Sequence, residues 1–383
     1  MKSINVAYVM HSSTLQEGSN RSLLNMLDGL MMKGVSPYLI LPENEDKSIY
    51  DEINKRKIPY IVLTYFLSVW PYVGGLKDYV LFIPRYIKIR MCNLIALLKI
   101  MRYVKLNKVD IIHSNVGPLL IGYQCARILN IKHVWHLREY QDLDFNFKTL
   151  YSKKSFKKKL LAANNHVIAI TLGIYNHFDL SKNSRIIYNG IMRSNEVYFS
   201  EHKKKYFLYV GRLTENKGAR VLVEAFIEFT KDNNEFYLYF AGQVTPDYQQ
   251  TLIDLAKKNG IENQIKFLGP RDDVYELMRH AYTLIVPSLH EGFGRITVEA
   301  MYNGCLVIGN NSAGTNEILE RDKLGILYTG TKGLLHAIKN VVNNGIEFYF
   351  PMIHMAQITA AKLYSQEANS TSVYNYYKEI ITH

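Results

Sequence analysis

A short stretch of the chain, His290–Gly304, combines glycines with two carboxylates. Gly292 and Gly294 precede a segment of helical character, and Glu291 and Glu299 stand eight positions apart. The first N–H groups of a helix have no partner inside it and carry partial positive charge, so this turn suits phosphate oxygens or sugar hydroxyls. Glu291 could accept hydrogen bonds from sugar hydroxyls, and Glu299 could bind a vicinal diol such as a ribose. The alternative is a helix cap with one buried, paired glutamate.

A second charged group follows an apolar run in the middle of the chain, in the segment GRLTENKG. Gly211 lets a ligand approach the backbone, Arg212 offers a planar fork of donors, and Lys217 adds a mobile charge at the threshold of a helix. This combination suits a diphosphate, because charge-assisted hydrogen bonds are the strong ones. The alternative is a surface turn with two solvated cations.

The elements that carry these residues follow from the apolar runs of the chain. Runs of strand length alternate with amphipathic segments such as 19–30, where Leu23, Leu27 and Leu30 share a helical face. This alternation predicts parallel sheets covered by helices on both faces. The expected strands lie at 4–11, 36–42, 58–64, 109–114, 132–137 and 166–171, and then at 206–211, 236–242, 264–269, 283–288, 305–310 and 325–330.

A polar, charged stretch at 189–205 interrupts the alternation and divides the chain. We expect two doubly wound, Rossmann-like α/β domains, 1–190 and 191–365, and a helix at about 366–383 that packs back on the first. Ligands of such sheets bind beyond the carboxyl ends of the strands. The two domains are therefore expected to face a central cleft.

These motifs together resemble a known family. The segment GRLTENKG, with the later run FLGPRDDVYELMRHAYTLIVPSLHEGFGRITVEAMYNGCLVIGNNSAGTNEIL, is similar to the donor half of family 4 glycosyltransferases, which are retaining enzymes of the two-Rossmann GT-B architecture. Glu291 and Glu299 match the family's motif of two glutamates separated by seven residues. The segments GSNRSLL, DIIHSN, VWHLRE, VIAIT and IIYNGI match landmarks of its N-terminal domain, in order. The resemblance covers essentially the whole chain.

The resemblance implies a division of labour between the domains. Residues 1–190 would form the acceptor side, and residues 191–365 would bind the nucleotide-sugar donor. Arg212 and Lys217, beside Gly211, would hold the donor diphosphate.

Further donor-side roles follow from the same resemblance. Glu299 would bind the ribose hydroxyls, and Arg271, after Gly269, would lie against the base. Glu291 would be a catalytic residue that faces the transferred sugar. The backbone of three consecutive residues would face the same sugar: Phe293, Gly294 and Arg295.

Two positions of the first domain also match the family. His136, in VWHLRE, matches a histidine that reaches the donor sugar in many members, although a lone histidine on a core strand is often structural. Gly18 keeps one glycine of the first loop, where many members have two. Glu17 takes the place of the other glycine, and near a diphosphate its charge would be repulsive unless it points at the acceptor.

The resemblance implies a UDP- or GDP-linked sugar as the donor, no cofactor and no metal. The sequence Asp142-Leu143-Asp144 spells the Asp-x-Asp pattern of metal-dependent glycosyltransferases. It lies in a polar loop of the first domain and not after a strand of a donor half. We therefore interpret it as surface.

Two other functions compete with this interpretation. Fold alone does not fix function, so a sugar-nucleotide epimerase or a phosphorylase with the same two domains is the first alternative. The net charge of +12 raises a nucleic-acid-binding protein as a remote one. No nucleic-acid-binding motif accompanies the charge, and we expect no nucleic-acid partner.

The positive charge has an uneven distribution. Residues 1–190 hold 26 Lys and Arg against 13 Asp and Glu, and the remainder is nearly balanced. Within 84–106, apolar residues recur at helical spacing between cations, which is typical of an interfacial helix; the apolar positions are Ile87, Met91, Leu94, Leu98 and Met101. A second cluster, KKSFKKKL, occupies 153–160. We expect peripheral docking to an anionic membrane surface, and the alternative is a packing helix with a solvated cationic face.

Other features concern location. The N-terminus reads as a first strand and not as a signal peptide. The uncharged stretch 58–76 is broken by prolines and glycines, so a strand and an aromatic loop are favoured over a membrane span. Three cysteines without a pairing pattern fit a reducing cytoplasm. With the composition and the resemblance, this predicts a cytoplasmic enzyme at the inner face of the cell membrane that extends a bacterial surface glycan, on a glycan or polyprenyl-linked acceptor.

Overall fold

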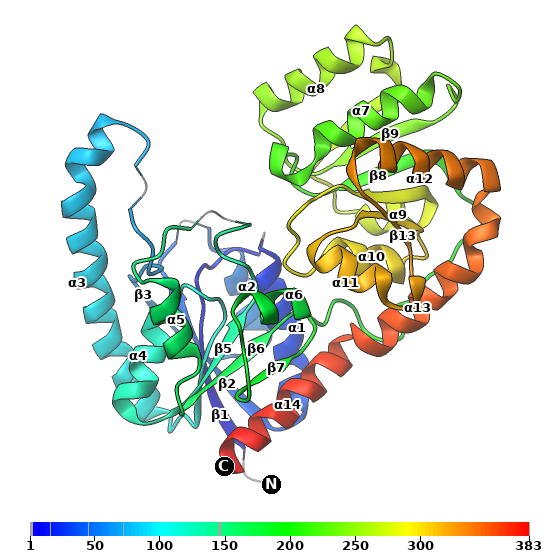
Figure 1. Cartoon of the computed structure of the whole chain (residues 1–383). Coiled ribbons are helices and arrows are strands. Elements are labelled where there is room, and N and C mark those ends of the chain that lie inside the picture. Colours follow the sequence, from blue (N-terminus) through cyan, green and yellow to red (C-terminus); the bar gives the residue numbers. More distant parts are fainter. Residues whose placement is uncertain (1–2, 16, 45, 72, 145–146, 383) are drawn as a thin grey trace. The chain divides into compact units, whose positions relative to one another are not determined.

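The computed structural model describes residues 3–15, 17–44, 46–71, 73–144 and 147–382, and it divides the chain into two compact units. Unit 1 comprises residues 1–190 and 366–383, and unit 2 comprises residues 191–365. The last helix of the chain therefore belongs to the first unit (Figure 1).

Unit 1 is built on a parallel sheet of seven strands in the order β3-β2-β1-β4-β5-β6-β7. Residues of β1, an interior strand, alternate between two cores: Val6 and Tyr8 belong to one hydrophobic cluster, and Ala7 and Val9 belong to the other. Both faces of the sheet are therefore buried, which explains why its strands are almost uniformly apolar. The strands are β1 (Ile4–Val9), β2 (Val35–Pro42), β3 (Tyr60–Leu63), β4 (Ile111–Ser114), β5 (Lys132–Leu137), β6 (Asn165–Ala169) and β7 (Ser184–Ile186). The short β7 was not among the expected strands.

The helices of unit 1 supply the two cores. They are α1 (Gly18–Met32), α2 (Ile49–Lys55), α3 (Leu76–Leu106), α4 (Leu120–Leu129), α5 (Lys153–Leu160), α6 (Leu172–His177) and α14 (Gln366–Thr382). The terminal helix α14 packs beside α1, and its Val373, Tyr377 and Ile380 lie in one core with Leu23 and Leu27 of α1 (Figure 1). Unit 1 is thus completed by residues from both ends of the chain.

Unit 2 is a second parallel sheet, with six strands in the order β10-β9-β8-β11-β12-β13. Its strands are β8 (Lys204–Val210), β9 (Tyr237–Ala241), β10 (Ile265–Gly269), β11 (Ala281–Val286), β12 (Val307–Asn310) and β13 (Ile326–Tyr328). Its helices are α7 (Ala219–Thr230), α8 (Pro246–Lys258), α9 (Val274–His280), α10 (Arg295–Tyr302), α11 (Ala313–Glu320), α12 (Gly330–Asn344) and α13 (Phe350–Leu363). The six strands expected for this part of the chain are all present.

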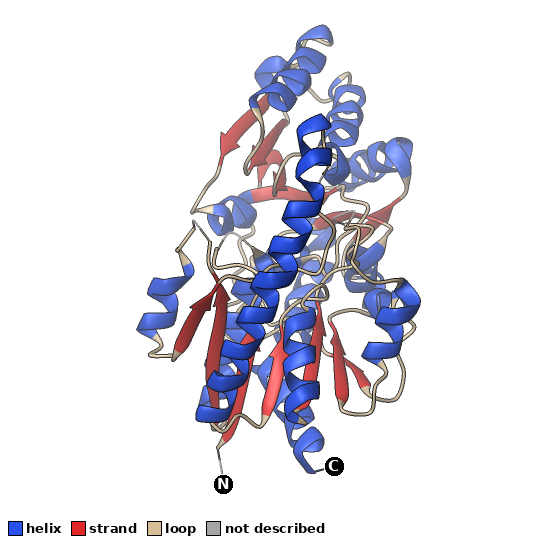
Figure 2. Ribbon diagram, turned by 90° about the vertical axis from the view of Figure 1, so that its left-hand side faces the viewer, coloured by secondary structure: helices blue, strands red, loops and turns tan. Residues whose placement is uncertain are grey.

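Helix α3 is long, and its buried residues lie only in its second half. Its buried residues are Ala96, Leu97, Ile100 and Val104, all in the last eleven positions. The first half continues beyond the carboxyl ends of the unit 1 strands (Figure 2). The helix begins at Leu76, eight residues before the expected segment at Pro84.

Within the uncharged stretch 58–76, residues 60–63 form β3 and the residues described between β3 and α3 form a loop, as favoured from the sequence. Trp70 of the loop stacks on Phe82 and Tyr86 of α3, with ring centroids 5.7 and 5.3 Å apart. Among the described residues, no helix is both long and apolar enough to cross a membrane.

Candidate active site

The turn before α10 is shaped by glycine. Gly294 has φ of 91°, a left-handed conformation that other residues rarely adopt, and α10 begins at the next residue. Gly314, on α11, lies against this turn: its N–H donates to Glu291 O at 2.9 Å, and a Cβ atom there would lie 2.3 Å from Phe293 O. The Phe293 ring is buried against Tyr364, so its backbone is what the turn can present to a ligand.

Both glutamates of the motif are paired with cations. Glu291 Oε1 lies 2.7 Å from Lys217 Nζ, and Glu299 Oε1 lies 3.1 Å from Arg295 Nη2, one turn earlier on α10. The Lys217–Glu291 pair joins the two segments first singled out in the sequence, which are 74 residues apart. The side chains of this pair are 38% and 21% exposed, so it is accessible to a ligand that could replace either partner.

A row of glycines follows three neighbouring strands of unit 2. Gly211, Gly242 and Gly269 come at the ends of β8, β9 and β10, all with positive φ. The Gly211 N–H donates to Ala241 O at 3.0 Å, and the Gly242 N–H donates to Gly269 O at 2.8 Å. A Cβ atom on Gly242 would lie 1.9 Å from Gly211 O, so only glycine fits. Sequence reasoning missed Gly242, although β9 and the residue after it (YLYFAG) end in a glycine, just as β8 and the residue after it do (LYVG).

The loop after β8 positions the two predicted diphosphate ligands. The Tyr209 hydroxyl donates to Arg212 O at 2.8 Å and fixes the backbone of the turn. Lys217 ends a short 3-10 helix, and Gly218 follows with φ of 74°, packed so closely that a Cβ atom would lie 2.6 Å from Pro287 O. The Arg212 side chain is exposed, and no ion pair of its guanidinium occurs among the residues described.

Arg271 lies between β10 and α9, where the resemblance implies contact with the base. Its guanidinium forms two hydrogen bonds with Asp273, at 2.7 and 2.5 Å. A base that stacks on its flat face would leave this pair intact.

In unit 1, His136 is buried on β5, on the same face of the strand as the core residue Val134. Burial, followed by the charge of Arg138 and the proximity of His113, holds the pKa of His136 well below its usual range, so the imidazole is neutral. Arg138 is itself buried and donates to Asn115 Oδ1 at 2.9 Å and to Asn189 Oδ1 at 2.6 Å.

Two carboxyl groups flank this region of unit 1. Burial raises the pKa of Glu139 to about 8, and its Oε1 accepts from the Gly117 N–H at 2.9 Å. Glu17 caps α1, whose first residue is Gly18, and its carboxylate pairs with His11 and accepts from the Ser12 hydroxyl at 2.8 Å. Sequence reasoning did not single out Glu139.

The Asp-x-Asp sequence is engaged in local contacts. Asp142 pairs with Lys153 at 2.6 Å and with His177 at 3.0 Å, and Asp144 accepts from the Tyr140 N–H at 2.8 Å.

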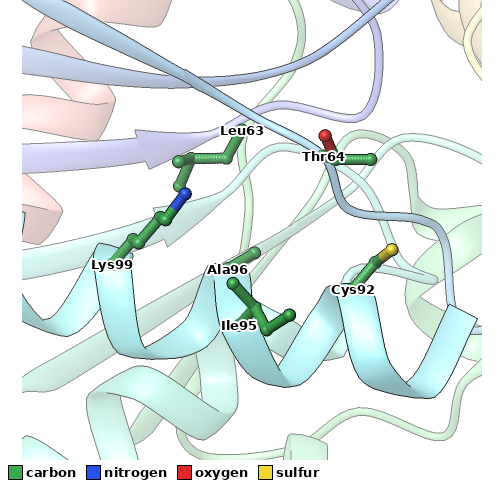
Figure 3. Close-up of a pocket in the computed structure, with 6 residues that line it drawn as sticks. All are labelled: Leu63, Thr64, Cys92, Ile95, Ala96 and Lys99. Atoms are coloured by element: carbon green, nitrogen blue, oxygen red, sulfur yellow. The ribbon is translucent and has the colours of Figure 1, made fainter. Parts of the chain in front are cut away.

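The described residues also line a half-open pocket of about 200 Å³ between the end of β3 and α3 (Figure 3). It is lined by Leu63, Thr64, Cys92, Ile95, Ala96 and Lys99. None of the predicted donor-site residues lines it, so it is separate from the candidate site.

Comparison with known proteins gives a family match within unit 2 and a fold for the chain. Residues 193–357 match the family model "Glycosyl transferases group 1". The chain is 23% identical to the capsular polysaccharide biosynthesis glycosyltransferase CapH of Staphylococcus aureus, over 57% of this chain and 64% of that one. It is 29% identical to the alpha-1,3/1,6-mannosyltransferase ALG2 of Dictyostelium discoideum, over 52% of each. The chain thus spans about half to two thirds of the length of these curated relatives.

Solved structures resemble the chain over its whole length. A glycosyltransferase from Rickettsia africae has a TM-score of 0.80 at 18% identity and covers 100% of both chains. HepE of Anabaena, solved in complex with UDP, has a TM-score of 0.78 at 19% identity and covers 99% of this chain and 100% of its own. The two parallel-sheet units therefore have the GT-B fold, and residues 193–357 are similar to the group 1 glycosyl transferases.

Proposed function

We propose that this protein is a retaining glycosyltransferase of family 4, which transfers a sugar from a nucleoside diphosphate to a glycan or lipid-linked acceptor in the synthesis of a bacterial surface polysaccharide. The observation that carries the proposal is the ion pair between Lys217 and Glu291 at 2.7 Å. This pair brings the mobile ammonium group of Lys217 next to the turn before α10, which is shaped by Gly294. Such a site favours a phosphate group.

The names and bound ligands of the similar proteins support both the proposed type of donor and the proposed pathway. CapH belongs to capsular polysaccharide biosynthesis by its name, and HepE was solved with UDP and with UDP-glucose. A UDP- or GDP-linked sugar is accordingly the proposed donor.

In the proposed reaction, the bond between the anomeric carbon and the diphosphate oxygen breaks, and its electron pair stays on the diphosphate. The acceptor hydroxyl forms the new bond on the same face of the sugar and passes its proton to the departing diphosphate. Arg212 and Lys217 would stabilise the negative charge that develops there, and this is why we propose a reaction without a metal ion. Glu299 would orient the ribose, Arg271 would lie against the base, and Gly18 would leave room in the first loop.

Glu291 has two successive roles in this scheme. Without a ligand it neutralises Lys217, and when the diphosphate takes over Lys217, the carboxylate is released toward the sugar hydroxyls. Glu291→Gln would then impair transfer more than it impairs the binding of a bare nucleotide.

We also propose that the enzyme works in the cytoplasm at the inner face of the membrane. Unit 1 carries 27 Lys and Arg against 15 Asp and Glu, whereas unit 2 carries 19 of each. Docking through unit 1 would bring the acceptor side to a lipid-linked acceptor.

A screen of sugar nucleotides tests the proposal as a whole. UDP- or GDP-linked sugars are expected to raise the melting temperature, and nucleotide release is expected to require an acceptor glycan. Conversion of the sugar nucleotide without an acceptor would instead indicate an epimerase. Salt-dependent RNA binding without any sugar-nucleotide binding would indicate a nucleic-acid-binding protein.

The ribose assignment gives a separate prediction. Glu299→Gln is expected to weaken UDP or GDP binding by roughly 10-fold, since a hydrogen bond to a charged group contributes about 1.5–3 kcal/mol. It should weaken binding of the 2′-deoxy nucleotides much less, and calorimetry measures both affinities. Glu224→Gln is the matched control, because Glu224 pairs with Arg220 one turn away at the same 3.1 Å. Equal losses on both nucleotides would remove Glu299 from the ribose site.

A further inference from the structure

Three buried side chains of unit 1 form a chain of polar contacts that ends at His136. Tyr377 Oη of α14 lies 2.6 Å from His113 Nδ1 on β4, and His113 Nε2 lies 3.1 Å from His136 Nδ1 on β5. All three side chains are fully buried. The last helix of the chain is thereby connected to a predicted catalytic histidine.

The direction of these hydrogen bonds follows from Arg138. Its Nη2 lies 3.3 Å from His136 Nδ1, and a guanidinium can only donate. His136 Nδ1 is therefore an acceptor, and the proton of the neutral ring is on Nε2. His113 must then donate from Nε2, which leaves its Nδ1 to accept from the Tyr377 hydroxyl.

The electrostatics of the cluster keep every member neutral except Arg138. Burial and the charge of Arg138 hold the pKa of His113 well below its usual range, as they do for His136. Burial raises the pKa of Tyr377 well above its usual range, so the hydroxyl keeps the proton that it donates. The Tyr377 hydroxyl has two acceptors within reach, Tyr8 Oη at 3.2 Å and His113 Nδ1 at 2.6 Å, and its one proton goes to the shorter contact with His113. Burial also keeps the Tyr8 hydroxyl uncharged.

His136 Nε2 is buried and has no hydrogen-bond partner among the described residues. A buried N–H of this kind needs an acceptor, and a sugar hydroxyl can supply one. We propose that Tyr377 and His113 are positioning residues, which hold His136 in the tautomer whose Nε2–H donates to the bound sugar. The contact with sugar rests on the proposed function, whereas the tautomer rests on the contacts alone.

Removal of the Tyr377 hydroxyl takes away the donor that fixes His113. His113 can then carry its proton on Nδ1, and its Nε2 lone pair faces the lone pair of His136 Nδ1. His136 can relieve this repulsion only by moving its own proton to Nδ1, which brings that proton against Arg138. The preference for the Nε2–H tautomer is therefore expected to weaken in Tyr377→Phe.

The test is nitrogen NMR of histidine side chains in the full chain, with signals assigned by His113→Gln and His136→Gln. The wild-type protein is expected to show His136 as the Nε2–H tautomer. This result tests the proposal in the wild-type protein itself, so it does not depend on whether a variant folds. Tyr377→Phe should shift the tautomer signals of His113 and His136. Tyr376→Phe is the matched control, because its hydroxyl bonds to Asn183 O at 2.6 Å and not to His113. An Nδ1–H tautomer of His136 in the wild type, or unchanged spectra in Tyr377→Phe, would overturn the proposal.

A rescue variant and kinetics complete the test. The side-chain amide of glutamine can replace the Nε2–H donor of histidine, so His113→Gln in the Tyr377→Phe background should restore the His136 tautomer. Tyr377→Phe is expected to lower kcat several-fold with the donor KM unchanged, and the double variant should recover most of this loss. If the tautomers shift and kcat does not, the positioning proposal stands and the assignment of His136 to the sugar fails.

Discussion

Lys217→Ala is expected to weaken the binding of UDP and GDP by roughly 10- to 100-fold, with the fold intact. A charge-assisted hydrogen bond to a diphosphate contributes about 1.5–3 kcal/mol, and each 1.4 kcal/mol corresponds to about a factor of ten. The substitution also leaves Glu291 without its partner at 2.7 Å, so a free carboxylate then repels the incoming anion. Arg212→Ala should weaken binding in the same range. Calorimetry with both nucleotides measures these effects.

The control for this prediction lies in the same unit. Lys339 pairs with Asp232 at 2.9 Å, and its side chain is 37% exposed against 38% for Lys217. Lys339→Ala removes an equivalent ion pair from another surface and should leave nucleotide affinity unchanged.

A second variant separates the two contributions. Glu291→Gln in the Lys217→Ala background removes the repulsion and should recover part of the affinity. Wild-type affinity in both Lys217→Ala and Arg212→Ala would exclude this loop as the diphosphate site.

The second large effect is expected on membrane binding through α3. Its exposed side carries a continuous apolar stripe, which comprises Leu76, Val80, Ile83, Ile87, Met91, Leu94 and Leu98, each at least 50% exposed. At 100° per residue, this stripe is turned away from the buried face at Leu97, Ile100 and Val104. Four of the five apolar positions predicted from the sequence thus face away from the domain core; the fifth, Met101, contacts the core.

Cations accompany the stripe. Lys77, Lys88 and Lys99 follow one edge at intervals of three turns, and all three are exposed. A helix with an exposed apolar stripe and a basic edge fits a membrane whose headgroups are anionic. We therefore expect the protein to sediment with phosphatidylglycerol vesicles at low salt and to stay in the supernatant at high salt.

Two sets of substitutions test this docking. Lys88→Glu with Arg90→Glu and Lys99→Glu should reduce vesicle binding by roughly 100-fold or more, because each basic residue near an anionic surface contributes about 1 kcal/mol. Ile87→Ser with Leu94→Ser and Leu98→Ser should abolish binding and leave the buried face of α3 unchanged.

The lysines of α5 need a different design. Lys153 and Lys157 pair with Asp142 and Asp179, so a change to Glu there would place like charges together and destabilise the unit. Lys154→Glu and Lys158→Glu avoid this effect, since both side chains are exposed. If the protein does not bind anionic vesicles but self-associates through the α3 stripe, a second copy of the chain covers this face.

The sequence was most informative where the chain is locally constrained. A helix was predicted directly after Gly292 and Gly294, and α10 begins at Arg295 because the left-handed Gly294 can precede a helix but not continue it. The expected strands of both domains were found because a sheet buried on both faces requires apolar runs. The amphipathic segment noted at 84–106 covers only part of α3, which begins at Leu76 and contains Pro84.

The contacts that complete the candidate site were beyond local reasoning. The ion pair of Lys217 with Glu291 forms where two loops meet at one edge of a sheet. The sheet predicts that these loops lie close together, but it does not predict which side chains pair. Tyr377 approaches His113 from a position 264 residues later in the chain, because α14 returns to unit 1. Nothing in the pattern around Tyr377 distinguishes it from Tyr376 beside it.

The return of α14 to unit 1 also sets an order of assembly during synthesis. Unit 2 is one continuous segment, so it can reach its full set of contacts as soon as residue 365 has left the ribosome. Unit 1 is translated first but must wait for Val373, Tyr377 and Ile380 before its core is filled. The part of the protein that is made earliest is therefore finished last, and its nascent form exposes apolar surface while the rest of the chain is translated.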